Sequence, residues 1–241
     1  MRLLHELGLL FFPAHCLSCG KRLASHKVVL CLTCEGRLPR FRFDEAENNP
    51  VCRVFWGRVR ITGALSLVPF VKGGMCQTLL HEFKYKNCIQ VGLHLGSLLG
   101  HSIGHTPLAA ADLLLPVPLH RKKEKKRGYN QSEILARACG SVLGIPVETR
   151  VLLRKDHGTS QTTMSRYERY ENVRDSFNLS PGAPDLDGKT LLLIDDVLTT
   201  GATLEACAEI LLAAFDCKVH VATLAYACEA TWGTTGTTGS D

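Results

Sequence analysis

One stretch of the chain, residues 190–203, strongly limits the folds open to it. It begins with the apolar run TLLLI, continues with the adjacent carboxylates Asp195 and Asp196, and ends in a loop of small and hydroxyl residues. An apolar, helix-like segment, 203–215, follows directly. An unbroken apolar run is typical of a strand buried on both faces, as in parallel sheets covered by helices. The stretch therefore predicts a strand–loop–helix unit of an α/β protein.

Strand-like and helix-like segments alternate from about residue 56 onward. Strands are expected at 63–71, 112–119, 147–155, 190–195 and 218–227, and helices at 73–85, 90–103, 131–144 and 203–215. This alternation predicts a parallel sheet flanked by helices. Pro116 and Pro118 confine the 112–119 strand to an edge of the sheet or end it early, because proline lacks the N–H that a ladder needs.

The loop and the two acids also indicate an anion site. The loop Thr199–Thr203 precedes a helix start, whose free backbone N–H groups and partial positive charge attract phosphate. Gly201 lets the backbone approach an anion closely. Carboxylates accept hydrogen bonds from paired hydroxyls, as on a ribose, and help to hold a divalent cation such as Mg²⁺. A sugar diol bound with Mg²⁺ would explain why Asp195 and Asp196 stand together despite their repulsion.

Four of the eleven cysteines form two Cys-x2-Cys pairs that are separated by eleven residues. This is the spacing of a tetrahedral thiolate site, in which two tight turns close around one ion. Four protein ligands leave no open position for water, so the sequence predicts a structural zinc. His15 and His26 are near enough to be alternative ligands. The predicted ligands are Cys16, Cys19, Cys31 and Cys34.

Positive charge is concentrated in one place. The net charge is only +5, but residues 121–127 contain six lysines and arginines, with Glu124 the single exception. Such a run is most often a solvated face, and it also suits an anion site, because Lys/Arg clusters neutralise phosphates whatever carries them. We read it as a basic loop after the 112–119 strand. The polar segment 156–177 lacks a clear period and is expected to form a long loop or lid.

Small residues and histidines recur at helical spacing between residues 96 and 105. Gly96, Gly100 and Gly104 follow one another every four residues, which in a soluble helix predicts close packing against a neighbour. His101 and His105 have the spacing of metal ligands, but with no third ligand in view they are expected to form a surface pair.

No apolar run reaches the roughly 18–20 residues that a membrane helix needs. Residues 1–16 fit an amphipathic helix better than a signal peptide, because His5 and Glu6 interrupt their apolar part. A cytoplasmic setting argues against a disulfide framework for the cysteines. We therefore expect a cytoplasmic protein without a membrane span.

The stretch LLLIDDVLTTGAT, residues 191–203, resembles the phosphoribosyl pyrophosphate (PRPP) motif of the type I phosphoribosyltransferases. The four-cysteine front and the blocks 79–87, 116–136 and 160–173 are similar to the ComF family (ComFC/GntX-like), in order along nearly the whole chain. The resemblance implies a zinc-finger segment fused to a type I phosphoribosyltransferase fold, with a link to DNA uptake during natural competence. Cys52 stands alone where some relatives carry further metal-binding cysteines, which favours a single zinc.

The resemblance also implies roles for residues. The 5′-phosphate of PRPP would rest on the Thr199–Thr203 loop, and Asp195 and Asp196 would hold the ribose hydroxyls and are the candidate catalytic residues. The implied PRPP-binding residues are Asp195, Asp196, Thr199, Thr200, Gly201, Ala202, Thr203, Arg121, Lys122, Arg127 and Gly128. The candidate substrate or lid contacts are Lys84, Tyr85, Lys86, Tyr129, Asn130, Gln131, Gln161, Arg166, Arg169 and Asn172. For Lys84 and Lys86, interaction with the helix dipole is the plainer alternative.

We expect three parts: a zinc-finger segment over 1–55, a phosphoribosyltransferase-like domain over 56–230, and a disordered Gly/Thr-rich tail over 231–241. The first functional hypothesis is a PRPP-dependent phosphoribosyltransferase with structural Zn²⁺, Mg²⁺ and an unknown acceptor. The alternative is a non-enzymatic protein that retains the PRPP fold and binds nucleic acid or a partner. A PRPP-sensing regulator is a third reading, weakened by the lack of a clear helix-turn-helix. The expected partners are PRPP, single-stranded DNA and competence or helicase proteins.

Overall fold

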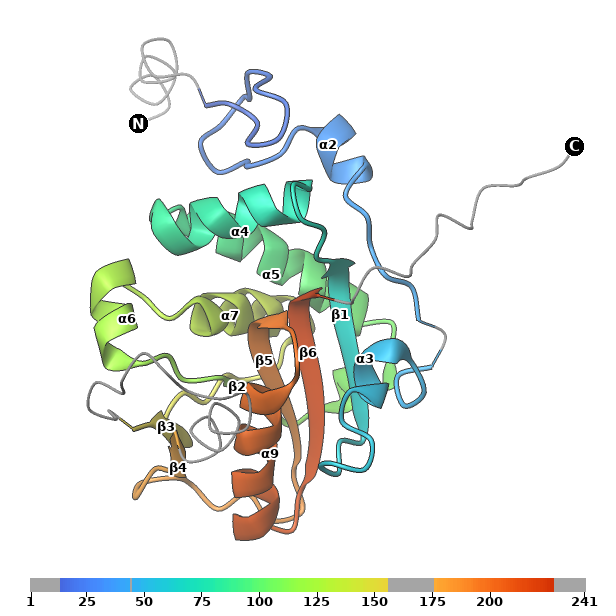
Figure 1. The fold of residues 1–241 in the computed structure, drawn as a ribbon, viewed down its shortest axis with the longest axis vertical. Coiled ribbons are helices and arrows are strands. Elements are labelled where there is room, and N and C mark those ends of the chain that lie inside the picture. Colours follow the sequence, from blue (N-terminus) through green and yellow to red (C-terminus); the bar gives the residue numbers. More distant parts are fainter. Residues whose placement is uncertain (1–13, 44, 156–175, 228–241) are drawn as a thin grey trace, which may run out of the picture.

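The computed structural model describes residues 14–43, 45–155 and 176–227. Its centre is a four-stranded sheet in the order β1–β6–β5–β2 (Figure 1). The strands are β1 (Gly63–Pro69), β2 (Leu113–Pro116), β5 (Thr190–Leu198) and β6 (Lys218–Tyr226). All neighbouring strands in it run parallel, which confirms the architecture predicted from the alternating segments. The short strand β2 lies at an edge and ends at Pro116, as its prolines require.

Helices cover both faces of this sheet (Figure 1). On one side lie α4 (Met75–Tyr85), α5 (Ile89–Ile103) and α7 (Gln131–Leu143), and on the other lie α9 (Ala202–Ala214) and the short α3 (Pro50–Arg53). In β5, Leu192 and Ile194 join the first core, whereas Leu191 and Leu193 join the second. Burial on both faces explains why the apolar run before the two acids is unbroken.

Helices α5 and α7 approach each other closely at the glycines. A Cβ atom on Gly96 would lie 2.8 Å from the Cβ of Ala138, and one on Gly100 would lie 2.9 Å from the Cβ of Val142. Both distances are shorter than real Cβ contacts, so only glycine fits. The predicted close packing is confirmed at these two positions, whereas the nearest atom to a Cβ on Gly104 is 3.5 Å away.

The basic run 121–127, which we expected to form a loop, is a helix, α6 (Arg121–Arg127). Both of its ends are capped: the Nδ1 atom of His120 accepts a hydrogen bond from the Lys122 N–H at 3.1 Å, and Gly128 ends the helix at φ +83°. The run has no apolar periodicity that would reveal a helix, and no residue of it is buried. The caps, rather than a buried face, define this element.

Two strand expectations also need correction. Strand β5 continues through Asp195 and Asp196 to Leu198, so the acids lie within the strand and Asp195 is paired with Thr223 of β6. The expected strand 147–155 is reduced to β3 (Leu152–Arg154), which pairs antiparallel with β4 (Phe177–Leu179) outside the main sheet. Only Val147 bridges to the main sheet, beside Leu114.

The four-cysteine segment leads into α2 (Leu32–Gly36) and then into an extended segment beside β1. There the N–H of Phe41 donates to the carbonyl oxygen of Leu67 at 2.9 Å. Further along, Val51, Cys52 and Phe55 are buried in the core that contains α9. The division at residue 55 stays a prediction.

The expected tail lies outside the described residues, as do residues 156–175 of the expected lid. A 3-10 turn, η1 (Pro107–Ala110), precedes β2. None of the helices in the described part of the chain combines the length and apolarity that a bilayer crossing requires.

Candidate functional site

The loop after β5 forms a small concave site at the start of α9. Gly201 adopts φ +82° and caps α9 without any side-chain hydrogen bond to the first turn. The free N–H groups of that turn therefore remain open to an anion. The residues that line this hollow are Asp195 and Val197–Leu204. The structure thus brings the five predicted loop residues together with Asp195; their role in binding PRPP stays a prediction.

Gly201 is required here by space as well as by conformation. A Cβ atom on it would lie 2.8 Å from Cγ1 of Val54 and 3.1 Å from Cε1 of Phe55. These two residues belong to the segment before β1, which therefore supports the loop from behind. Sequence reasoning did not identify this support, because the contact joins residues that are far apart in the chain.

Asp195 is held by the start of α7. The Ser132 hydroxyl donates to its Oδ1 at 2.8 Å, and the Asp196 N–H donates to the same atom at 2.9 Å. Burial, and after it the adjacent Asp196 carboxylate, raise the pKa of Asp195 to about 7. The two acids therefore relieve their repulsion partly by keeping a proton near neutral pH. Ser132 was missed in the sequence, where nothing distinguishes it from other helix-start serines.

Asp196 is paired with a cation from α4. The Lys84 Nζ lies 2.7 Å from Oδ2 of Asp196, and both side chains are largely buried. Lys84 thus lies at the acid pair, whereas the nearby Lys86 pairs with Glu82 of its own helix at 2.8 Å. Beside the Lys84–Asp196 pair is a pocket of about 480 Å³. Its lining residues are Phe70, Gln77, Leu80, His81, Lys84, Tyr85, Asp196, Val197, Thr199 and Ala227.

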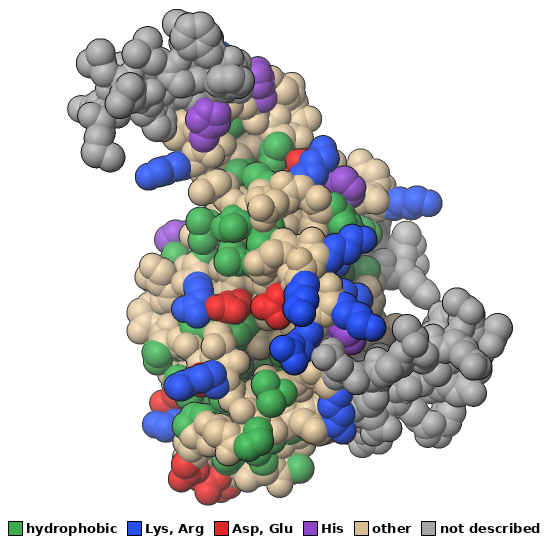
Figure 2. All heavy atoms as spheres, turned by 90° about the vertical axis from the view of Figure 1, so that its left-hand side faces the viewer, with side chains coloured by type: hydrophobic (Ala, Val, Ile, Leu, Met, Phe, Trp, Pro, Cys, Tyr) green, Lys and Arg blue, Asp and Glu red, His purple; other side chains and the backbone are tan. Residues whose placement is uncertain are grey.

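A second pocket of about 330 Å³ lies between α6 and the end of α4. Arg127 reaches across it, with its guanidinium 5.6 Å from the centre of the Tyr85 ring and Nη1 donating to Gln131 Oε1 at 2.7 Å. On the face that carries α6, Lys and Arg side chains surround a few acidic ones (Figure 2). The lining residues are Lys84, Tyr85, Asn87, Lys123, Lys126 and Arg127.

The residues of the basic run that line this pocket differ in part from those predicted. Of the three that we selected, Arg127 lines the pocket, whereas Arg121 and Lys122 are exposed on α6 and do not. Lys123 and Lys126 line it instead. Burial, followed by the charges of Arg154 and Arg127, lowers the pKa of Lys123. This crowding of cations, together with the absence of a carboxylate among the described lining residues, indicates an anion site.

The predicted residues after α6 build the junction with α7. The Tyr129 hydroxyl donates to the Phe83 carbonyl oxygen, and the Asn130 side chain donates to the Val117 carbonyl oxygen at 3.0 Å. Asn130 also caps α7, and Gly128 supplies the left-handed turn. These contacts tie α4, β2 and α7 together at the site. The predicted lid residues Gln161, Arg166, Arg169 and Asn172 lie outside the described residues.

The four predicted metal ligands come together. Their sulfur atoms all lie within 4.8 Å of one another, and the Sγ atoms of Cys19 and Cys31 are 3.8 Å apart. Zn–S bonds of about 2.3 Å in a tetrahedron require sulfur atoms about 3.8 Å apart, so the donor set and spacing fit zinc. Burial raises the pKa of Cys16, but backbone N–H donors outweigh it and lower this pKa to about 6. Cys16 can therefore supply a thiolate to a metal ion, whereas the pKa of Cys34 is raised to about 12, so a metal must displace its proton.

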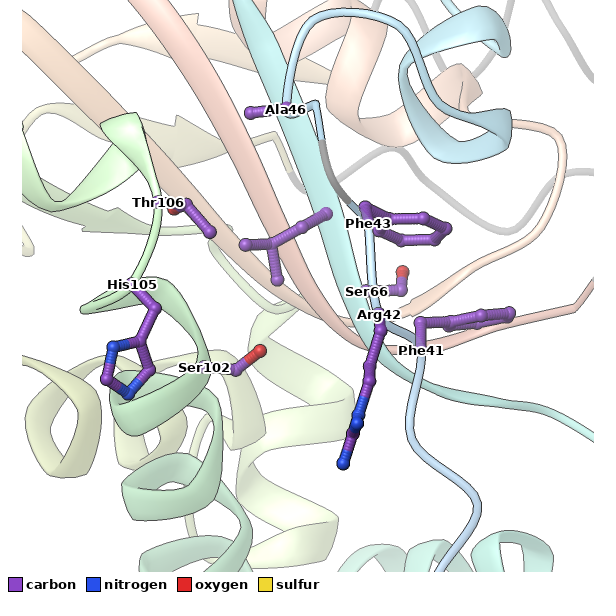
Figure 3. A pocket seen from close by; sticks show the side chains of 9 residues that line it. Phe41, Arg42, Phe43, Ala46, Ser66, Ser102, His105 and Thr106 are labelled. Carbon is purple, nitrogen blue, oxygen red and sulfur yellow. The ribbon is translucent and has the colours of Figure 1, made fainter. Parts of the chain in front are cut away.

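A further pocket of about 220 Å³ lies between the segment before β1 and the end of α5 (Figure 3). Arg42 stands on one wall, and Ser102 and His105 on the other. The pocket shares no lining residue with those around Asp195 and Asp196. His105, which the sequence analysis assigned to a surface pair, lines it, but none of the predicted metal, PRPP, substrate or lid residues does.

Comparison with known proteins agrees with this geometry. Residues 129–231 match the family model of the phosphoribosyl transferase domain. Competence protein F of Haemophilus influenzae is 25% identical over 217 residues, which cover 83% of this chain and 92% of that protein. Competence protein ComFC of Bacillus subtilis is 28% identical over 82% of this chain and 77% of its own length. DNA utilization protein YhgH of Escherichia coli K12 is 28% identical over 56% of this chain and 60% of its own.

These matches agree with the family resemblance that the PRPP-like motif, the basic block and the cysteine pairs carry in the sequence. The chain therefore contains a phosphoribosyl transferase domain, preceded by a four-cysteine cluster, and is a homologue of competence proteins F and ComFC.

Proposed function

We propose that the chain binds PRPP and transfers its phosphoribosyl group to an acceptor. The observation that carries this proposal is the strand–loop–helix unit. In it, Asp195 and Asp196 near the end of β5 lie close to the start of α9, whose N–H groups no side chain caps. The 5′-phosphate would accept hydrogen bonds from the loop around Gly201, and the carboxylates would accept them from the ribose hydroxyls. The phosphoribosyl transferase domain match supports the same assignment.

The pyrophosphate group would lie toward α6. The pocket lined by Lys123, Lys126 and Arg127 also contains Lys84, which borders the acid pair as well. A ligand with phosphates at both ends of a ribose would therefore meet donors at both of its ends. Transfer breaks the bond between the anomeric carbon and pyrophosphate, and the positive charges of α6 would stabilise the negative charge that the leaving group gains.

The residues at the acid pair also fit Mg²⁺. Asp195 and Asp196 offer the hard oxygen atoms that this ion prefers. Without a ligand, the Lys84 ammonium pairs with Asp196, and Asp195 keeps a proton up to about pH 7. The negative charge of the acid pair thus needs a cation or a proton to balance it, and Mg²⁺ could take that place. When bound, Mg²⁺ would neutralise part of the charge of the pyrophosphate. Lys84, which lines the pockets on both sides of the acid pair, would contribute a further positive charge to the pyrophosphate.

The pocket of about 480 Å³ is the place where an acceptor would approach. It contains Asp196 and Thr199 on one side and apolar walls formed by Phe70, Leu80 and Val197. These walls favour a largely apolar or flat acceptor, while Gln77 and His81 offer hydrogen bonds at its rim. Desolvation by such walls would protect the reacting carbon from water.

The four-cysteine cluster is proposed to hold a structural Zn²⁺. Four thiolate ligands complete a tetrahedron and leave no position for water. The three homologues described above are named for competence and DNA utilization. We extend that link with DNA uptake to this chain and propose that it is cytoplasmic.

A non-enzymatic role in binding nucleic acid is the second candidate. The exposed cations of α6 favour it, because they lie on one helix where a phosphate backbone could be followed. Single-stranded DNA binding that survives Asp195→Asn and falls steeply with salt would indicate a surface separate from the acid pair. Competence or helicase proteins are the protein partners proposed for this role.

The proposal is tested by calorimetric titration of PRPP with Mg²⁺. We expect micromolar binding to the zinc-loaded wild type and its loss in the double variant Asp195→Asn/Asp196→Asn. The matched control is Glu148→Gln/Asp187→Asn, which removes one partly buried and one exposed carboxylate outside the described pockets around the acids. The absence of binding to a folded wild type would refute the enzymatic proposal and leave the nucleic-acid role.

A further inference from the structure

The guanidinium of Arg58 contacts the loop before α9, although 142 positions separate Arg58 from Thr200. Its Nη1 donates to the carbonyl oxygen of Thr200 at 2.7 Å and to that of Val54 at 3.0 Å. Its Nη2 forms an ion pair with the carboxylate of Glu205. One planar group thus joins the segment before β1, the loop and the first turn of α9, a task that suits the fork of arginine and not a lysine ammonium.

The hydrogen bond to Thr200 fixes the direction of the next N–H group. The described chain contains no cis peptide bond, and in a planar trans peptide the C=O and the N–H point in opposite directions. Because the Thr200 carbonyl is directed at Arg58, the Gly201 N–H is directed away from it. If this peptide turned over, the Thr200 oxygen would take the place of the donor and repel a bound anion.

The ion pair has a separate electrostatic effect. Glu205 lies in the first turn of α9, and only 5% of its side chain is exposed. A buried carboxylate without a cation at this place would repel a phosphate at the same helix start. Arg58 neutralises that charge from the side of the segment before β1. The ion pair with Arg58 thus reduces the repulsion that Glu205 would exert on an anion at this helix start.

We propose that Arg58 is a positioning residue for the 5′-phosphate. It sets the peptide between Thr200 and Gly201 and neutralises Glu205, and it acts through these groups rather than by touching the ligand. Val54 and Phe55 complete the support from the same segment. This inference rests on the proposed function and names a residue that neither the domain match nor the sequence motif contains, since the match begins at residue 129.

The test compares two ligands that occupy different ends of the proposed site, ribose 5-phosphate and inorganic pyrophosphate, each titrated with Mg²⁺. Arg58→Gln is expected to lower the affinity for ribose 5-phosphate by about 10- to 100-fold, the effect of losing a charge-assisted hydrogen bond. The affinity for pyrophosphate is expected to stay unchanged. Arg58→Lys should recover only part of the loss, because one ammonium cannot satisfy all three partners.

A double-mutant cycle separates the two effects of Arg58. Arg58→Gln/Glu205→Gln also removes the negative charge of Glu205 and is expected to bind ribose 5-phosphate more tightly than Arg58→Gln alone, though less tightly than the wild type. The remaining loss measures the bond to Thr200. Arg53→Gln is the matched control, because Arg53 bonds to Asn48 at 3.0 Å and lies over Trp56 rather than against the loop.

The titrations distinguish a failure of the role of Arg58 from a failure of the proposed function. Unchanged ribose 5-phosphate affinity in Arg58→Gln would overturn the role of Arg58 and leave the proposed function intact. Equal losses for both ligands would also overturn it, since they would reflect a general effect on folding. A wild type that binds neither ligand would refute the proposed function, and this role with it.

Discussion

At the scale of single residues, the raised pKa of Asp195 implies that the free energy of unfolding depends on pH. Its folded-state pKa of about 7 exceeds the ordinary value of 3.8, so the protonated form is favoured in the folded chain. The stabilisation from this proton is complete below about pH 4 and is lost as the pH rises through 7. Asp195→Asn lacks the titration, so we expect its free energy of unfolding to exceed that of the wild type at pH 8, by at most about 4 kcal/mol.

Urea denaturation of the zinc-loaded proteins at pH 5 and pH 8, without Mg²⁺ or PRPP, measures this difference. The advantage of Asp195→Asn should shrink at pH 5, where the wild-type carboxyl is already protonated. Asp112→Asn serves as the control, because Asp112 accepts from the Thr190 N–H at the opposite end of β5. An advantage of equal size at both pH values would contradict the prediction.

The contrast between predicted and missed residues has a physical reason. Asp195, Asp196 and Gly201 could be predicted because a strand, a loop and a helix start follow one another in the sequence. Carboxylates suit a sugar diol and Mg²⁺, and glycine lets the backbone approach an anion. Ser132 lies 63 positions from Asp195 and was found only in the structure. The hydrogen bond between Ser132 and Asp195 depends on how α7 packs on the sheet, and no local sequence pattern predicts that packing.

At the scale of elements, the contact between α5 and α7 predicts a steric effect. Gly96→Ala would place a Cβ 2.8 Å from both the Ala138 Cβ and the Leu135 carbonyl oxygen. We expect a loss of about 1–3 kcal/mol in the free energy of unfolding, because overpacking outweighs the better helix propensity of alanine. Thermal unfolding of Gly96→Ala and Gly104→Ala checks it. Gly104 has φ −56° and room for a Cβ, so a similar loss there would contradict the packing explanation.

Elements with an apolar face were predictable, and those without one were not. The helices α5 and α9 and the strand β6 have their bounds close to those expected, since burial imposes a period on their sequences. Helix α6 has no buried residue, and its existence depends on the caps at His120 and Gly128. The strands β3 and β4 have three residues each, too few for any period to appear.

At the scale of the whole molecule, the cysteine segment and the sheet are joined by a small set of contacts. Leu30 and Leu38 enter the same core as α4 and α5. The Nε2 of His94 on α5 lies 3.1 Å from Oε2 of Glu35 in α2. The loop Thr199–Thr203, by contrast, is supported by Val54 and Phe55 from the opposite face of the sheet. The four-cysteine cluster therefore rests on the first core, whereas the loop of the candidate site is supported from the second.

This separation predicts that metal and ligand binding respond differently to loss of the cluster. Cys16→Ser should abolish zinc content and lower the unfolding midpoint by about 5 °C or more, since metal binding contributes directly to folding and each kcal/mol is worth about 2–4 °C in a chain of this length. Affinity for ribose 5-phosphate should stay close to that of the wild type. Metal analysis, thermal unfolding and calorimetry with Mg²⁺ present measure the three quantities.

Cys52→Ala is the informative control, because Cys52 is buried beside α9 and lies outside the four-sulfur cluster. It should keep its zinc while losing some stability through a core cavity. If Cys16→Ser lost ribose 5-phosphate binding while still folded, the contact between Glu35 and His94 would have to transmit the state of the cluster through α5 and α7 to Ser132 and Asp195. Retained binding would instead mean that the cluster stabilises the first core and that the segment from Val54 to Arg58 alone supports the loop.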